Sequence, residues 1–153
     1  MAGGTTSAEL FDAIAAEAAA ESPLWGDSLR ADPEPEQVFG ALVPERFAAG
    51  LETIYEGYLV HYGRPRLFAP PDADVALLLG DYLYAHGLVR VAATGNLDAV
   101  ATLAGLISTC AHLRAEGAGG DGEAWMAAVR DLGGSPAADG TGAALAAHSA
   151  RLG

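Results

Sequence analysis

Apolar residues recur at helical spacing through most of this 153-residue chain, and this pattern predicts an all-α fold. Amphipathic or apolar stretches of helical length lie at 7–22, 44–63, 72–94 and 96–116. Two shorter stretches follow after residue 122. A chain of this length suits one domain, so we expect a single bundle of about five to six helices.

Local signals predict where several helices begin and end. Thr6, Asp72 and Asn96 each precede an apolar stretch, and their side chains are suited to accept a hydrogen bond from a first-turn N–H. Gly63 is expected to end the second long helix as a left-handed C-terminal residue.

The distribution of glycine and polar residues predicts four parts. Residues 1–5 are expected to be disordered, and residues 6–116 to form the helical core. The glycine-rich segment 117–122 is expected to act as a hinge, because glycine has the most conformational freedom to lose on ordering. Residues 123–153 then form short C-terminal helices that pack as a lid.

The stretch 72–94 is apolar on nearly every face, which predicts a central helix surrounded by other helices. It carries one acid, Asp81, in its middle. An unpaired carboxylate there would cost several kcal/mol, so a donor is expected to meet it. The donors available by sequence are Arg64, Arg66, Arg90 or a tyrosine hydroxyl.

The charge balance limits the partners that this chain can have. The net charge is −12, with eight arginines and no lysine, which excludes nucleic acid because phosphate neutralisation needs a basic surface. Cys110 is the only cysteine, so no disulfide can form within one chain, and a reducing cytoplasm fits. No secretory leader and no transmembrane segment of about 18 apolar residues is recognised.

No strong metal-binding pattern is present. Glu52 and Glu56 lie four apart on one helix face and could share a divalent cation, but ordinary solvated residues are the favoured interpretation. The four histidines show no ligand spacing within any helix. We therefore expect no metal, no cofactor and no catalytic residue on this chain.

Tyrosines recur at helical spacing in the second and third long stretches. The five are Tyr55, Tyr58, Tyr62, Tyr82 and Tyr84. Residues at this spacing form either part of the core, which is the favoured interpretation, or the wall of an apolar groove for a ligand or partner.

The segments Tyr55-Glu-Gly-Tyr-Leu-Val-His-Tyr-Gly-Arg-Pro-Arg66 and Leu78-Leu-Gly-Asp-Tyr-Leu-Tyr-Ala85 together resemble the middle of trans-polyprenyl diphosphate synthases. These are all-helical enzymes in which a helix with an aspartate-rich motif precedes an arginine-containing loop and a helix with Gly-Asp-Tyr-Leu. The resemblance covers about residues 40–116. It implies that this chain has a similar fold.

The departures from that family concern its catalytic machinery. Two aspartate-rich clusters hold magnesium against the diphosphate in those enzymes, but the first position reads Leu51-Glu-Thr-Ile-Tyr-Glu-Gly-Tyr58 here and the second is missing. The chain thus resembles the small, non-catalytic subunit of heteromeric hexaprenyl or heptaprenyl diphosphate synthases, in which a catalytic partner subunit supplies Mg²⁺. The resemblance implies that Asp81 is a buried structural acid that holds the Arg64 loop. The residues expected to line the product cavity or the subunit interface are Tyr58, Leu59, Tyr62, Leu79, Tyr82 and Leu83.

Two other hypotheses come from different functional classes. One is a helical scaffold or interaction protein that assembles with itself and has no link to isoprenoids. The other, less favoured, is an enzyme in which Glu52, Glu56 and a histidine bind a metal.

Overall fold

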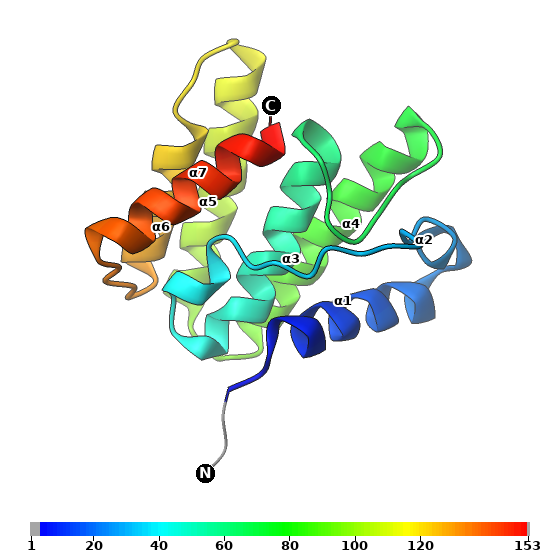
Figure 1. Ribbon diagram of the computed structural model, residues 1–153, viewed down its shortest axis with the longest axis horizontal. Helices are drawn as coiled ribbons and strands as arrows, with labels where there is room; N and C mark the ends of the chain where they lie inside the picture. The colour runs from blue at the N-terminus through cyan, green and yellow to red at the C-terminus, as the bar shows by residue number, and fades with distance from the viewer. Residues whose placement is uncertain (1–3, 153) are drawn as a thin grey trace.

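Helices make up the regular structure of the protein, as seen in a computed structural model that describes residues 4–152 (Figure 1). In chain order they are α1 (Ser7–Glu21), α2 (Pro23–Gly26), the 3₁₀ helix η1 (Gly40–Leu42), α3 (Glu45–Tyr62), α4 (Ala73–Ala92), α5 (Leu97–Ala115), α6 (Asp121–Asp131) and α7 (Ala138–Leu152). Within the described residues the only β-type pairing is an isolated bridge between Leu29 and Phe68. The all-α prediction is confirmed. The four-residue α2 is the helix that apolar spacing did not predict.

The helix caps form where the sequence predicts them, with one exception. The side chains of Thr6, Asp72 and Asn96 accept backbone N–H groups of α1, α4 and α5 at 3.1, 2.9 and 3.0 Å. Gly63, however, has a φ of −143° and is not left-handed. Glycine is needed there for space, because a Cβ would lie 2.9 Å from the carbonyl oxygen of Arg151.

Helix α3, not α4, is the central helix of the protein. It lies in the middle of the bundle in Figure 1, with the 27–39 segment crossing in front of it. Every residue from 51 to 59 is buried. Helices α1, α4 and α7 and the short η1 all contact it. The prediction of a central helix at 72–94 is wrong, because α4 packs against α3 along one side and leaves the opposite side exposed.

Two glycine pairs allow α3 and α4 to approach closely. A Cβ on Gly87 of α4 would lie 2.9 Å from the carbonyl oxygen of Gly50 on α3. A Cβ on Gly57 of α3 would lie 3.0 Å from the carbonyl oxygen of Gly80 on α4. Backbone atoms cannot move aside as a flexible side chain can, so glycine at these positions sets the spacing of the two helices.

The C-terminal helices belong to the main core. Trp125, Met126 and Val129 of α6 and Ala144 of α7 are buried in the same apolar cluster as Tyr55 of α3. The prediction that the core ends near residue 116 is therefore wrong, since these side chains fill a space that the earlier helices leave open. A second cluster joins α1, α2 and α4.

The predicted terminal and hinge segments are only partly described. Residues 1–3 of the predicted disordered 1–5 segment lie outside the described residues. Thr5 is held by a hydrogen bond from its N–H to Glu45 Oε1, at 2.7 Å. In the 117–122 segment, Gly117 and Gly120 have positive φ values of 65° and 113°, which let the chain turn from α5 into α6.

Candidate functional site

Two glutamates on α3 lie in the interior of the protein. Glu52 and Glu56 are both 0% exposed. The favoured interpretation from the sequence, two solvated residues on an outer face, is wrong. Periodicity did not identify them as buried because their partners lie outside the helix, in the segments just before and just after α3.

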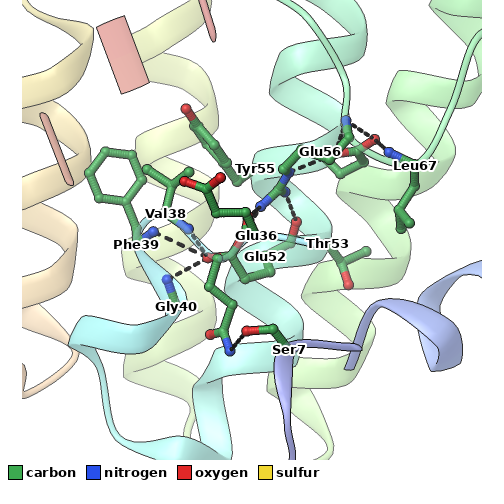
Figure 2. Close-up of polar contacts among 12 residues, drawn as sticks. Ser7, Glu36, Val38, Phe39, Gly40, Glu52, Thr53, Tyr55, Glu56 and Leu67 are labelled. Carbon is green, nitrogen blue, oxygen red and sulfur yellow. Dashed lines mark hydrogen bonds and ion pairs between the residues drawn. The ribbon is translucent and has the colours of Figure 1, made fainter. Parts of the chain in front are cut away.

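Glu52 connects α3 to the segment before it. Its Oε2 atom accepts the backbone N–H groups of Val38, Phe39 and Gly40 at 3.0, 3.1 and 2.6 Å (Figure 2). Its Oε1 atom forms an ion pair with the guanidinium of Arg66. The carboxylate therefore fixes the start of η1 against the central helix.

Glu56 binds the loop that follows α3. Its carboxylate accepts the N–H of Leu67 at 2.8 Å and the N–H of Arg66 at 3.0 Å. It also accepts Nε–H of Arg66 at 3.0 Å. In Figure 2 both glutamates extend from the same side of α3 toward residues 38–40 and 66–67.

The guanidinium of Arg66 bridges the two carboxylates and is 0% exposed. It donates further hydrogen bonds to the carbonyl oxygens of Glu36 and Glu52, at 2.8 and 3.2 Å. Burial alone would lower the pKa of Arg66, but the carboxylates of Glu52 and Glu56 raise it overall. Arg66 therefore stays charged, and we refer to these three residues as the Glu–Arg–Glu triad.

Glu52 and Glu56 lie within Leu51–Tyr58, the stretch that the sequence resemblance compares with the first metal-binding cluster. Both carboxylates already face an internal cation and several backbone N–H groups, so they do not fit a magnesium ion. Among the described residues, no group of three His, Cys, Asp or Glu side chains could hold a metal.

Asp81 is not the buried acid that the sequence predicts. Its side chain is 66% exposed, and its partner is Nε2 of His61 at 3.2 Å rather than Arg64. The acid is exposed, at the edge of the contact between α4 and α3, because His61 belongs to α3. Arg64 instead contacts α7, where its backbone N–H donates to the carbonyl of Arg151 at 2.9 Å.

The six predicted lining residues do not surround one cavity. Tyr58 and Leu59 are buried in the main core, with Tyr62 packed at its edge. Leu79 and Leu83 are buried in the second cluster, where Tyr82 stacks on Trp25 with ring centroids 5.6 Å apart. None of the six lines any of five surface pockets formed by residues 4–152.

The exposed side of α4 is unusually apolar. Leu77, Leu78 and Val89 are 56%, 55% and 62% exposed. Between 77 and 92 the exposed residues of α4 are Leu77, Leu78, Asp81, Ala85, Val89 and Ala92, which we call the outer face of α4. Asp81 is the only charged residue among them.

By length and hydropathy, α4 is also the one described helix that could cross a membrane, although only 28% of its most apolar window is buried in the protein. One such helix is weak evidence for membrane insertion, because helices of soluble proteins pass the same test.

A second polar cluster joins α3 to the C-terminal helices. The Tyr55 hydroxyl lies 2.8 Å from Nδ1 of His148 on α7. The Tyr58 hydroxyl donates to Oδ2 of Asp121, which also accepts Nε–H of Arg114 at 2.8 Å. Burial raises the pKa of both tyrosines above the ordinary value, so both hydroxyls stay protonated.

Sequence reasoning missed this second cluster. The tyrosines were identified as a stripe, but their partners His148 and Asp121 are more than 60 residues away along the chain. The one available signal was Asp121 itself, an acid within a glycine-rich segment.

Comparison with known proteins leaves the family open, since no family model, no curated protein and no solved structure matches this chain.

Proposed function

We propose that this chain is a cytoplasmic, non-catalytic subunit that binds a helical partner through the outer face of α4. The observation that carries the proposal is that Leu77, Leu78 and Val89 are exposed. They lie on α4, a helix whose overall hydropathy is typical of a helix buried inside a protein. Apolar patches of this kind are typical of protein interfaces.

The partner that we propose is the catalytic chain of a polyprenyl diphosphate synthase. The support is the resemblance of residues 40–116 to that family, together with the ion pairs that Glu52 and Glu56, in the stretch compared with the first metal-binding cluster, form with Arg66. A chain with this triad has no place for magnesium there, so the metal chemistry would belong to the partner.

A partner of lower charge is favoured over a second copy of the chain. Each copy carries a net charge of −12, and two such copies repel each other at any distance within the screening length. The outer face itself contributes only Asp81 to this repulsion.

The experiment combines the purified chain with a purified, aspartate-rich polyprenyl diphosphate synthase. We expect the chain alone to turn over no allylic diphosphate, the mixture to co-elute as one complex in size-exclusion chromatography with light scattering, and the product length to change. No complex and an unchanged product would contradict the proposal.

A pair of variants tests the surface. Leu78→Glu places a charge in the outer face and should abolish the complex, whereas Ala146→Glu places the same charge on an exposed position of α7 and should not. If the chain forms a homodimer that Leu78→Glu dissociates, the self-assembling scaffold replaces the synthase subunit as the function.

A further inference from the structure

Asp81 is the one charged residue on the outer face of α4, and its neighbours on that face are apolar. Leu77, Leu78 and Ala85 lie three or four residues away, about one helical turn, so their side chains share one side of the helix with Asp81. The Asp81 side chain is 66% exposed. Since charged residues are depleted in the cores of protein interfaces, any partner that covers these leucines has to accommodate this carboxylate.

The chain itself supplies Asp81 with a counter-ion from one side only. Among residues 4–152, its one ion-pair partner is His61 of α3, whose Nε2 lies 3.2 Å from Oδ1. An imidazole is charged only when it is protonated, whereas guanidinium and ammonium groups are charged throughout the physiological pH range. The exposed side of the carboxylate therefore remains open to a cation from another chain.

A helix packed on the outer face would remove Asp81 from water. The axes of packed helices lie about 8–10 Å apart, and aspartate is too short to extend past a covering helix to solvent as lysine or arginine can. An acid buried without a counter-ion loses its hydration without compensation, which offsets the gain from burying the leucines beside it. The partner therefore has to bring a positive charge to this point.

A second copy of the chain cannot bring that charge through the same face. The outer face contains no arginine, and the chain has no lysine at all. Each copy also carries a net charge of −12. The charge of Asp81 thus acts against self-association and favours a different, basic helix.

We propose, taking from the proposed function that the outer face of α4 is the interface, that Asp81 selects the partner. The face accepts a helix whose apolar side carries one arginine or lysine, and the ion pair between this residue and Asp81 fixes the register of the two helices. A single polar residue within an apolar seam determines register and partner choice in coiled coils for the same reason.

The test uses synthetic helical peptides that share a stripe of leucines. Three of them differ at one position in the middle of the stripe, which is arginine, leucine or glutamate. A fourth has leucine at that position and its arginine on the polar side, so its net charge equals that of the first. A free peptide can shift along α4 until its cation meets Asp81, so no register has to be assumed.

Binding is measured by fluorescence anisotropy at about pH 8, at the upper end of the range in which histidines titrate, and is located by NMR through the backbone amides of α4. We expect the peptide with arginine in its stripe to bind at least about tenfold more tightly than the glutamate peptide. It should also bind more tightly than the peptide with arginine on its polar side.

Variants of the chain assign this preference to Asp81. Asp81→Lys should reverse the order of the arginine and glutamate peptides, and Asp81→Leu should abolish the preference. Asp12→Lys makes the same change of charge at an exposed position of α1 and should leave the order unchanged.

The proposal is overturned if none of the peptides binds to α4, if the arginine and glutamate peptides bind equally, or if Asp81→Lys leaves their order unchanged. The synthase takes no part in this measurement. A chain that prefers the arginine peptide but forms no complex with the synthase contradicts the proposed function alone. A complex with the synthase, together with no preference among the peptides, contradicts the role of Asp81 alone.

Discussion

Arg66 is the residue on which the interior of this protein most depends. Its guanidinium joins two buried carboxylates of α3 and also binds a carbonyl of the 27–39 segment. Replacing it with methionine keeps much of the side-chain volume but leaves Glu52 and Glu56 without their shared cation. Removing one partner of a buried ion pair costs about 3–5 kcal/mol.

We therefore expect Arg66→Met to lower the free energy of unfolding by about 3–5 kcal/mol, measured by urea denaturation. The control is Arg130→Met, because Arg130 is exposed on α6 and makes no ion pair within the described residues. A loss no larger than that of the control would show that the triad contributes little to stability.

Burial of His148 makes stability depend on pH. Burial holds the pKa of His148 below its ordinary value of 6.5, so the folded protein resists protonation. Below about pH 6.5 the unfolded chain takes up a proton that the folded chain does not, and stability falls as the pH falls.

We expect His148→Gln to show a smaller loss of unfolding free energy than the unchanged protein when the pH is lowered from about 7 to about 5.5. His112 is exposed on α5, so His112→Gln is the control and should retain the full dependence. The unfolding free energy of each variant is measured by denaturation at each pH. If it falls equally with pH in both variants, the assignment to His148 is contradicted.

At the scale of elements, the spacing of α3 and α4 is the most sensitive packing contact. Gly87→Ala places a Cβ 2.9 Å from the carbonyl oxygen of Gly50, so the helices must separate. We expect a loss of about 1–3 kcal/mol, as for overpacked interiors.

The same substitution at Gly105 is the control for helix propensity. A Cβ there meets no atom within 4 Å on the surface of α5, and alanine should stabilise the helix by about 0.5–1 kcal/mol. Thermal unfolding of the two variants checks both signs. A stabilising Gly87→Ala would mean that the two helices are not in close contact.

The elements themselves could be predicted from the sequence because their signals are local. The caps at Thr6, Asp72 and Asn96 act within one helical turn, and apolar spacing reports on one helix at a time. These signals were sufficient for the fold class and for most helix positions.

Which helix is central could not be predicted, because burial depends on partners that lie outside the helix itself. Glu52 and Glu56 made α3 appear half-polar, and only the folded chain brings Arg66 and the N–H groups of 38–40 and 66–67 to them. The leucines of α4 made that helix appear internal, although Leu77 and Leu78 are exposed. Apolar residues show that a helix face can be buried, but they do not show whether this chain itself buries that face.

At the scale of the whole molecule, the C-terminal third is part of one cooperative unit. Trp125 of α6 is 1% exposed and stacks on Phe39, with ring centroids 5.3 Å apart. A chain that ends at Glu116 would expose the aromatic side chains of α3 to water.

We expect such a truncated chain to lack a cooperative thermal transition and to show poor dispersion in its NMR spectrum. The full chain should unfold in one step. A truncated chain that folds cooperatively would restore the predicted boundary near residue 116.

The internal guanidinium limits what acids at positions 52 and 56 can do. Aspartate at both positions would not by itself create a cation site, because the shorter acids would still face the positive charge of Arg66. Arg66 would have to be replaced as well, and with it the anchor of two loops.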